Sequence, residues 1–296
     1  MSNPRPGAEP DLDLDAALAA AVAAARAAGA LIAAAWGDGA ADKGVVVKSS
    51  HVDLVTETDK AAEAAIREAL LAAFPGHAFV GEEEAAEAGG AVVLTDGPTW
   101  MVDPLDGTTN FVHGYPFSCV CIGLAVGQEP VVGVVFNPIL GELYTAKKGG
   151  GAFCNGKRIR CSGTKDLRQA LSATEIGTTR DAETVNAMFD RVRRLTAASR
   201  SLRCCGSCAM NICGVAAGRL DVFYEIGFGG CWDVAAAAIV LREAGGQLLD
   251  PSGGPWHVNS RRVLAANAHL GPAAAAILAA CATSAAEPPP PPSPKP

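Results

Sequence analysis

Hydrophobic and polar residues follow helix-like and strand-like patterns along the first half of the chain. An Ala-rich amphipathic stretch over residues 12–36 predicts one helix, and residues 58–74 predict another that ends at Pro75-Gly76. Apolar runs separated by Gly-containing turns predict antiparallel strands at residues 118–126, 129–137 and 142–147. Short extended segments are predicted at residues 45–48, 52–55, 79–81 and 99–103.

The second half of the chain begins near Ser162 and alternates strand-like with helix-like segments. Strands are predicted near residues 171–175, 201–205, 221–224, 247–249 and 263–265. Helices are predicted at residues 182–198, 208–217, 233–244 and 269–281. This mixture predicts an α/β fold without an internal repeat.

These patterns divide the chain into four parts. We expect a flexible segment over residues 1–13, an N-terminal α+β half over 14–161 and a C-terminal α/β half over 162–282. Seven of the nineteen prolines lie in residues 287–296, so residues 283–296 are expected to form a disordered, Pro-rich tail.

Composition narrows the classes of function. A chain of 296 residues can bury a large core, as one large domain or two closely packed ones. The net charge of −7 argues against nucleic acid as a partner, because phosphate backbones favour basic surfaces. Arg26 and Gly29 interrupt the apolar stretch from Ala16, so no membrane span is expected. Residues 1–15 are acidic and contain proline, so no targeting segment is expected. The ten cysteines fall on apolar stretches or beside glycines, as free thiols of a cytoplasmic protein do.

Residues 100–113 carry the most informative motif, Trp-Met-Val-Asp-Pro-Leu-Asp-Gly-Thr-Thr-Asn-Phe-Val-His. An apolar run ends in two carboxylates, Asp103 and Asp106, and a Gly-Thr-Thr segment then offers backbone and hydroxyl donors. Carboxylates bind hard divalent cations, and a helix N-terminus binds anions. The motif therefore indicates a metal-assisted phosphate site, because a metal ion lets an acidic protein bind phosphate.

Three further acidic segments, like residues 100–113, lie at the ends of predicted elements. They cover residues 53–59, 81–84 and 231–233, and each lies where a strand or turn meets a helix. Ligands gather at such element ends in α/β proteins. The alternative for any one segment, such as Asp53, is a solvated surface charge. Since the fourth segment follows residue 162, the C-terminal half is expected to complete a metal site begun in the N-terminal half.

In order and in approximate spacing, these four segments resemble the inositol monophosphatase family over about residues 14–282. Residues 201–209 and 223–230 are similar to its plant-type branch, which includes enzymes that act on L-galactose 1-phosphate. The resemblance implies a layered αβαβα sandwich of the sugar-phosphatase type and a homodimer. It also implies Mg²⁺-dependent hydrolysis of inositol monophosphates, such as myo-inositol 1-phosphate, with sensitivity to lithium.

The resemblance assigns roles to individual residues. Glu82, Asp103 and the Leu105 carbonyl would hold one Mg²⁺, and Asp103, Asp106 and Asp233 a second. A third, weaker Mg²⁺ would lie near Glu82, and Asp233 would also support protonation of the leaving group. Thr108, held by Asp59, would orient the attacking water. The implied substrate contacts are Glu82, Asp106, Gly107, Thr108, Thr109, Gly206, Ser207, Cys208, Glu225 and Asp233.

Several alternatives stay open. The substrate could be L-galactose 1-phosphate, histidinol phosphate or a broader range of polyol phosphates. Lys48 is either a loop residue near the third metal or a solvated lysine, and His113 is expected to be structural rather than a base.

Two functions of a different class are a non-catalytic binding protein and a redox-regulated one. The redox alternative arises because Cys205-Gly-Ser-Cys208 reads as C-x-x-C. Thioredoxin-like redox domains carry this motif in a βαβ unit near the start of the domain, whereas here it lies late in the chain. This position argues against a redox function. Cys119 and Cys121 alternate along a strand and are expected to chelate a metal poorly.

Overall fold

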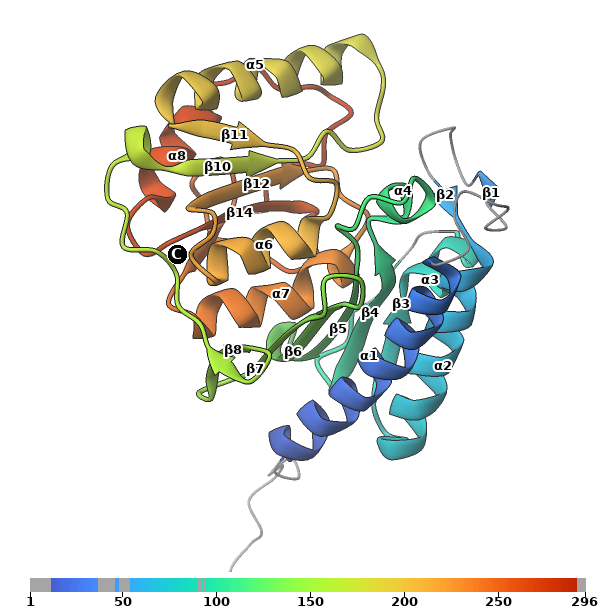
Figure 1. Cartoon of the computed structure of the whole chain (residues 1–296). Helices are drawn as coiled ribbons and strands as arrows, with labels where there is room; N and C mark the ends of the chain where they lie inside the picture. Colours follow the sequence, from blue (N-terminus) through green and yellow to red (C-terminus); the bar gives the residue numbers. More distant parts are fainter. Residues whose placement is uncertain (1–11, 37–45, 48–53, 90–91, 93, 292–296) are drawn as a thin grey trace, which may run out of the picture.

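The computed structural model describes residues 12–36, 46–47, 54–89, 92 and 94–291. Two mixed sheets alternate with three helical layers (Figure 1). Helices α1 (Leu14–Trp36) and α2 (Glu57–Ala73) form one outer layer, α6 (Cys208–Ala216) and α7 (Cys231–Glu243) the middle layer, and α5 (Ala182–Ala198) and α8 (Gly271–Ala279) the other outer layer. The predicted α/β class and the αβαβα sandwich are therefore confirmed.

The first sheet has seven strands in the order β3-β4-β5-β6-β7-β8-β9. Strands β3 and β4 run parallel, and the later neighbours pair antiparallel. Their bounds are β3 (Ala78–Gly81), β4 (Thr99–Asp106), β5 (Cys119–Val126), β6 (Glu129–Asn137), β7 (Glu142–Lys147), β8 (Gly151–Cys154) and β9 (Lys157–Arg158). A separate small sheet pairs β1 (Val46–Val47) with β2 (Leu54–Val55).

Helix α1 packs on the outer face of the seven-stranded sheet through small side chains. Ala17, Ala21, Ala24 and Ala28 are buried, and their spacing of three or four residues places them on one helix face. Small side chains let α1 approach α2 and the sheet closely. By length and composition α1 could also cross a membrane, but its apolar face is packed into the same core cluster as β4, β5 and β6.

The second sheet has five strands in the order β11-β10-β12-β14-β13. Their bounds are β10 (Leu171–Thr174), β11 (Ser201–Arg203), β12 (Val222–Ile226), β13 (Gln247–Leu249) and β14 (Arg262–Ala266). Helix α7 lies between the two sheets and is buried from Cys231 to Leu241, as expected for a helix that is apolar on all sides. A Cβ on Gly133 of β6 would lie 2.2 Å from the Ala236 carbonyl oxygen, so α7 packs directly against the sheet backbone.

The predicted elements are present with shifted ends, and several short elements were not predicted. Strand β4 continues to Asp106 instead of ending at residue 103, and α7 begins at Cys231 instead of at residue 233. Helix α8 is shorter than the predicted 269–281. The elements for which no bounds were predicted are α3 (Glu82–Glu87), α4 (Thr108–Val112), β8, β9 and a 3₁₀ turn at Leu167–Gln169. Elements of two to six residues are too short to show a periodic pattern.

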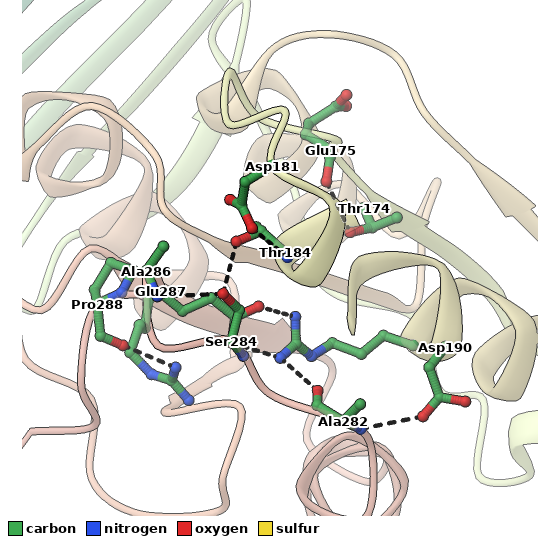
Figure 2. A network of polar contacts seen from close by, with 12 residues as sticks. Thr174, Glu175, Asp181, Thr184, Asp190, Ala282, Ser284, Ala286, Glu287 and Pro288 are labelled. Atoms are coloured by element: carbon green, nitrogen blue, oxygen red, sulfur yellow. Dashed lines mark hydrogen bonds and ion pairs between the residues drawn. The ribbon is translucent and has the colours of Figure 1, made fainter. Parts of the chain in front are cut away.

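The described part of the C-terminal segment contacts helix α5 and strand β14. Within residues 283–291, Ser284 is buried and Glu287 and Pro288 are partly buried, whereas most of the other residues are exposed; residues 292–296 lie outside the described part, as do residues 1–11. The Arg191 guanidinium of α5 donates hydrogen bonds of 2.5 and 2.7 Å to the Glu287 carboxylate, and both side chains are buried (Figure 2). Arg262 of β14 donates to the Pro288 carbonyl at 3.1 Å. These contacts could not be predicted from the sequence, because Arg191 and Arg262 are distant from residues 287 and 288 along the chain.

Candidate functional site

A bulge in β4 places two aspartates on the same face of the sheet. Asp103 pairs with Cys121 and Asp106 with Cys119, so β4 has one residue more than β5 between these pairs. Residues three apart on a regular strand face opposite sides, and the extra residue reverses this relationship. The Leu105 side chain therefore packs into the core cluster of α1 and α2, whereas both aspartate side chains are directed to the cavity bordered by α7.

Three carboxylates from three elements meet in this cavity. Oxygens of Glu82 at the start of α3, Asp103 of β4 and Asp233 of α7 all lie within 4.8 Å of one another. Burial, followed by the negative charge of its neighbours, raises the pKa of both Asp103 and Asp233 well above the usual range. A divalent cation would neutralise this repulsion, and the all-oxygen donor set fits a hard ion. The backbone N–H of Leu105 donates to Asp103 at 2.8 Å and fixes that carboxylate.

Asp106 lies beside the three carboxylates and is hydrogen-bonded to the start of α6 in the middle helical layer. Its carboxylate accepts hydrogen bonds from the Ser207 hydroxyl at 2.6 Å, from the Ala209 N–H at 2.8 Å and from the Cys208 N–H at 3.3 Å. These donors surround the N-terminus of α6, where negative charge is stabilised. Burial still raises the pKa of Asp106 to about 6. The role of Asp106 as a ligand stays a prediction, and its place at the wall of the same cavity is compatible with that role.

Thr108 and Asp59 form the second polar pair of the site. The Thr108 hydroxyl lies 3.2 Å from Asp59 Oδ1 and 3.1 Å from the Leu105 carbonyl oxygen. Asp59 is held in the first turn of α2, where the Thr56 N–H donates to it at 2.9 Å. Burial raises the pKa of Asp59 to about 6. The pair is therefore rigidly placed, and its carboxylate has a pKa suited to accepting a proton near neutral pH.

The residue before Thr108 must be glycine. Gly107 has φ of +87°, and a Cβ there would lie 2.9 Å from the Gly206 carbonyl oxygen. This contact brings the start of α4 against the loop before α6. The predicted phosphate donors and the predicted alcohol contacts therefore lie side by side.

The cavity has a volume of about 860 Å³ and brings the predicted site together. Asp59 lies behind its wall, next to Thr108. The predicted residues that line the cavity are Glu82, Asp103, Leu105, Asp106, Gly107, Thr108, Thr109, Gly206, Ser207, Cys208, Glu225 and Asp233. His113 lines it as well, whereas Lys48 and Asp53 lie outside the described residues.

Glu225 of β12 is a buried acceptor that lines the cavity. It is 6% exposed, and its Oε2 has no hydrogen-bond partner among the described residues. Burial first, and then the charge of Glu175, raises its pKa well above the usual range. An acceptor left unpaired in a ligand-sized cavity is suited to bind a hydroxyl group of a substrate.

Glu175 is a site residue that the sequence analysis did not identify. Its carboxylate accepts hydrogen bonds from the Cys205 N–H at 2.8 Å and from the Asn211 side chain at 2.6 Å. Asn110 of α4 donates to the Cys205 carbonyl at 2.7 Å from the other side. Glu175 and Asn110 therefore fix the loop that carries Gly206. Glu175 could have been identified from the sequence, because it ends the strand predicted at residues 171–175. Three of the four acidic segments likewise include a strand end.

The thiols of the C-x-x-C sequence do not favour redox chemistry. Cys208 is buried, and burial followed by the charge of Glu225 raises the pKa of its thiol well above the usual range. Reactive cysteines need a lowered pKa. All ten cysteines are free thiols, as expected.

The sequence is similar to known phosphatases, which agrees with the acidic residues of the site. The sequence model of the inositol monophosphatase family matches residues 13–285. Inositol monophosphatase 2 of Solanum lycopersicum is 59% identical over 229 residues, which cover 75% of this chain and 86% of that protein. Inositol monophosphatase 1 of Homo sapiens is 46% identical over 227 residues, with coverages of 76% and 81%.

Solved structures show the same relationship. The structure of inositol monophosphatase from Anabaena (Nostoc) superposes with a TM-score of 0.77 at 33% identity, over 90% of this chain and 96% of that one. Family membership explains the acidic group, because this family is metal-dependent. The chain belongs to the inositol monophosphatase family and is a phosphoric monoester hydrolase.

Proposed function

We propose that the protein hydrolyses inositol monophosphates, myo-inositol 1-phosphate in particular, with Mg²⁺ as its cofactor. The observation that carries this proposal is the buried group of Glu82, Asp103 and Asp233 next to the Thr108–Asp59 pair. The names of the relatives support an inositol phosphate as substrate.

The residues around the acidic group fit two or three Mg²⁺ ions. Glu82, Asp103 and the Leu105 carbonyl would bind one ion, and Asp103, Asp106 and Asp233 a second. A third would lie near Glu82. Bound Mg²⁺ lowers the pKa of a coordinated water and stabilises negative charge on phosphate and leaving oxygens.

Thr108 and Asp59 orient the attacking water. The Thr108 hydroxyl accepts a hydrogen bond from this water and donates its own proton to Asp59 Oδ1, 3.2 Å away. Asp59 is deprotonated above its pKa of about 6, so it can draw the proton from Thr108 as the water attacks. Water attacks phosphorus directly, so no covalent intermediate with the protein is needed.

The start of α4 supports the phosphate group. The N–H groups of Gly107 and Thr108 and the Thr109 hydroxyl are suited to bind phosphate oxygens where the helix begins. Asp233, which lies in the first turn of α7 near Asp103 and lines the cavity, would support protonation of the leaving alcohol.

Glu225 and the loop before α6 face the alcohol. Glu225 can accept hydrogen bonds from two neighbouring hydroxyl groups, and a substrate lacking them would leave a buried acceptor unpaired. Gly206, Ser207 and Cys208 border the same space. These contacts favour a polyol phosphate over a simple alkyl phosphate.

A side-by-side measurement of kcat/KM tests the proposal. Phosphate release is measured from myo-inositol 1-phosphate, L-galactose 1-phosphate and histidinol phosphate, each with Mg²⁺ and with a chelator. We expect Mg²⁺-dependent turnover with the highest kcat/KM for myo-inositol 1-phosphate, and inhibition by lithium. A higher kcat/KM for L-galactose 1-phosphate would make that compound the preferred substrate in place of myo-inositol 1-phosphate. Turnover in the presence of the chelator would contradict the metal mechanism.

Family membership also supports a cytoplasmic homodimer, which sedimentation of the full chain and localisation of a tagged copy would test.

A further inference from the structure

Two cysteine side chains lie directly opposite the aspartates of the bulged strand. Cys119 and Cys121 are two residues apart on β5, so their side chains share one face of the sheet. Across the ladder Cys119 pairs with Asp106 and Cys121 with Asp103. The two sulfur atoms are 3.7 Å apart. Residues two apart on a strand share a face, so this spacing favours chelation by the pair, against the expectation from the sequence.

The distances fit a tetrahedral metal ion. Two thiolates on Zn²⁺, each at about 2.3 Å, have sulfur atoms about 3.8 Å apart. The Cys119 sulfur also lies 3.8 Å from Asp106 Oδ2, to which its thiol donates a weak hydrogen bond, and 3.8 Å from the Ser207 hydroxyl. Asp106, Cys119 and Cys121 each offer a ligand atom within 4.8 Å of the others. An ion at this place would replace the proton between sulfur and carboxylate.

We propose that Asp106, Cys119 and Cys121 form a second metal site, which takes a thiophilic divalent ion such as Zn²⁺ or Cd²⁺ and inhibits the enzyme. Two sulfurs and one oxygen select softer ions than the all-oxygen group of Glu82, Asp103 and Asp233 does. Binding exchanges one divalent ion for the two thiol protons, which are released to solvent.

The site has a route to solvent and a fourth position. Asp106 and Ser207 line the substrate cavity, and both contact Cys119, so the thiol pair lies directly behind the cavity wall. The Ser207 hydroxyl or a water molecule can complete four ligands.

Inhibition follows because Asp106 belongs to both ligand sets. This part rests on the proposed function, in which Asp106 binds Mg²⁺. An ion held by Cys119 and Cys121 draws the Asp106 carboxylate toward β5 and withdraws it from Mg²⁺. Trace Zn²⁺ would then reduce turnover although Mg²⁺ is plentiful.

A titration of the full chain with Cd²⁺ tests the site without reference to activity. Cys204→Ser is the background for all samples, because it removes an exposed thiol. The readout is the ultraviolet charge-transfer absorbance of thiolate-bound Cd²⁺. We expect one ion held by two thiolates, and a loss of affinity of at least about tenfold in Cys121→Ser and in Cys119→Ser.

Two controls keep the result interpretable. Cys161→Ser removes a half-buried thiol elsewhere and should leave the titration unchanged. Cys121→Ala repeats the loss of the ligand without a buried hydroxyl, and circular dichroism verifies that each variant is folded. Equal Cd²⁺ affinity and absorbance with and without Cys121 would overturn the proposal.

Phosphatase assays at fixed Mg²⁺ with increasing Zn²⁺ test the inhibition. We expect wild type to be inhibited at a Zn²⁺ concentration at least about tenfold lower than Cys121→Ser. Thiol-dependent Cd²⁺ binding without any difference in inhibition would overturn the inhibitory role. Cd²⁺ binding in a protein that shows no phosphatase activity would contradict the proposed function but not the site.

Discussion

The Thr108 hydroxyl donates a hydrogen bond to the buried carboxylate of Asp59, although the two residues lie 49 positions apart in the sequence. Strand β4 delivers Thr108 to the start of α4, and the capping of α2 by Thr56 fixes Asp59 opposite it. The pair has a defined geometry before any substrate binds, which is what a water-orienting device requires.

Replacing Asp59 with asparagine should lower kcat by about 10²–10⁴-fold with little change in KM, because the amide cannot accept the proton. Since the pKa of Asp59 is raised to about 6 and the base must be deprotonated, wild-type kcat should fall as the pH drops through that value. Steady-state kinetics across pH at saturating Mg²⁺ measure both effects. Glu57→Gln, an exposed change in the same helical turn, is the control. Full kcat in Asp59→Asn would contradict the role.

Replacing Asp103 with asparagine should remove the carboxylate shared by both proposed Mg²⁺ ions. We expect kcat/KM to fall by about 1,000-fold or more, since metal ions supply several kcal/mol of charge stabilisation. Added Mg²⁺ should raise the Tm of wild type, because a ligand that binds the folded state stabilises it, and should not raise that of the variant. Calorimetry with and without Mg²⁺ measures this shift. Asp96→Asn, at an exposed position, should behave as wild type.

Replacing Glu175 with glutamine should release the loop before α6 while leaving the acidic group intact. Hydrogen bonds to a charged group contribute about 1.5–3 kcal/mol, so we expect KM to rise by about 10–100-fold and kcat to change much less. Kinetics with myo-inositol 1-phosphate separate the two parameters. Glu183→Gln, an exposed change on α5, is the matched control. An unchanged KM would show that the loop keeps its place without Glu175.

Replacing Glu287 with glutamine should lower the free energy of unfolding, because the Arg191 guanidinium is then buried without its counter-charge (Figure 2). Removing one partner of a buried ion pair costs about 3–5 kcal/mol. Urea unfolding gives the difference. Arg193→Ala on the same helix breaks an exposed pair with Asp190 and should change the unfolding free energy little. Equal stability of the two variants would contradict the anchoring role.

Much of the architecture could be predicted from the sequence because the elements show regular patterns. The Ala-rich α1, the three long strands β5, β6 and β7, and helix α5 each extend over several periods of their pattern. The acidic segments were also visible, since carboxylates next to strand ends are a local feature. The extents of short helices such as α3 and α4, which carry Glu82 and Thr108, could not be predicted.

The sequence by itself determined which residue types are available for metal and phosphate chemistry and in which order they occur. Only the tertiary structure decided that the Glu82, Asp103 and Asp233 carboxylates converge, whereas the adjacent Glu83 donates its N–H to Glu63 at 2.8 Å. It also decided that Glu175 holds the loop before α6 and that Cys119 and Cys121 lie opposite Asp106 and Asp103. The reason is physical: strand register, one bulge and the packing of α7 between two sheets set distances between residues that no local pattern encodes.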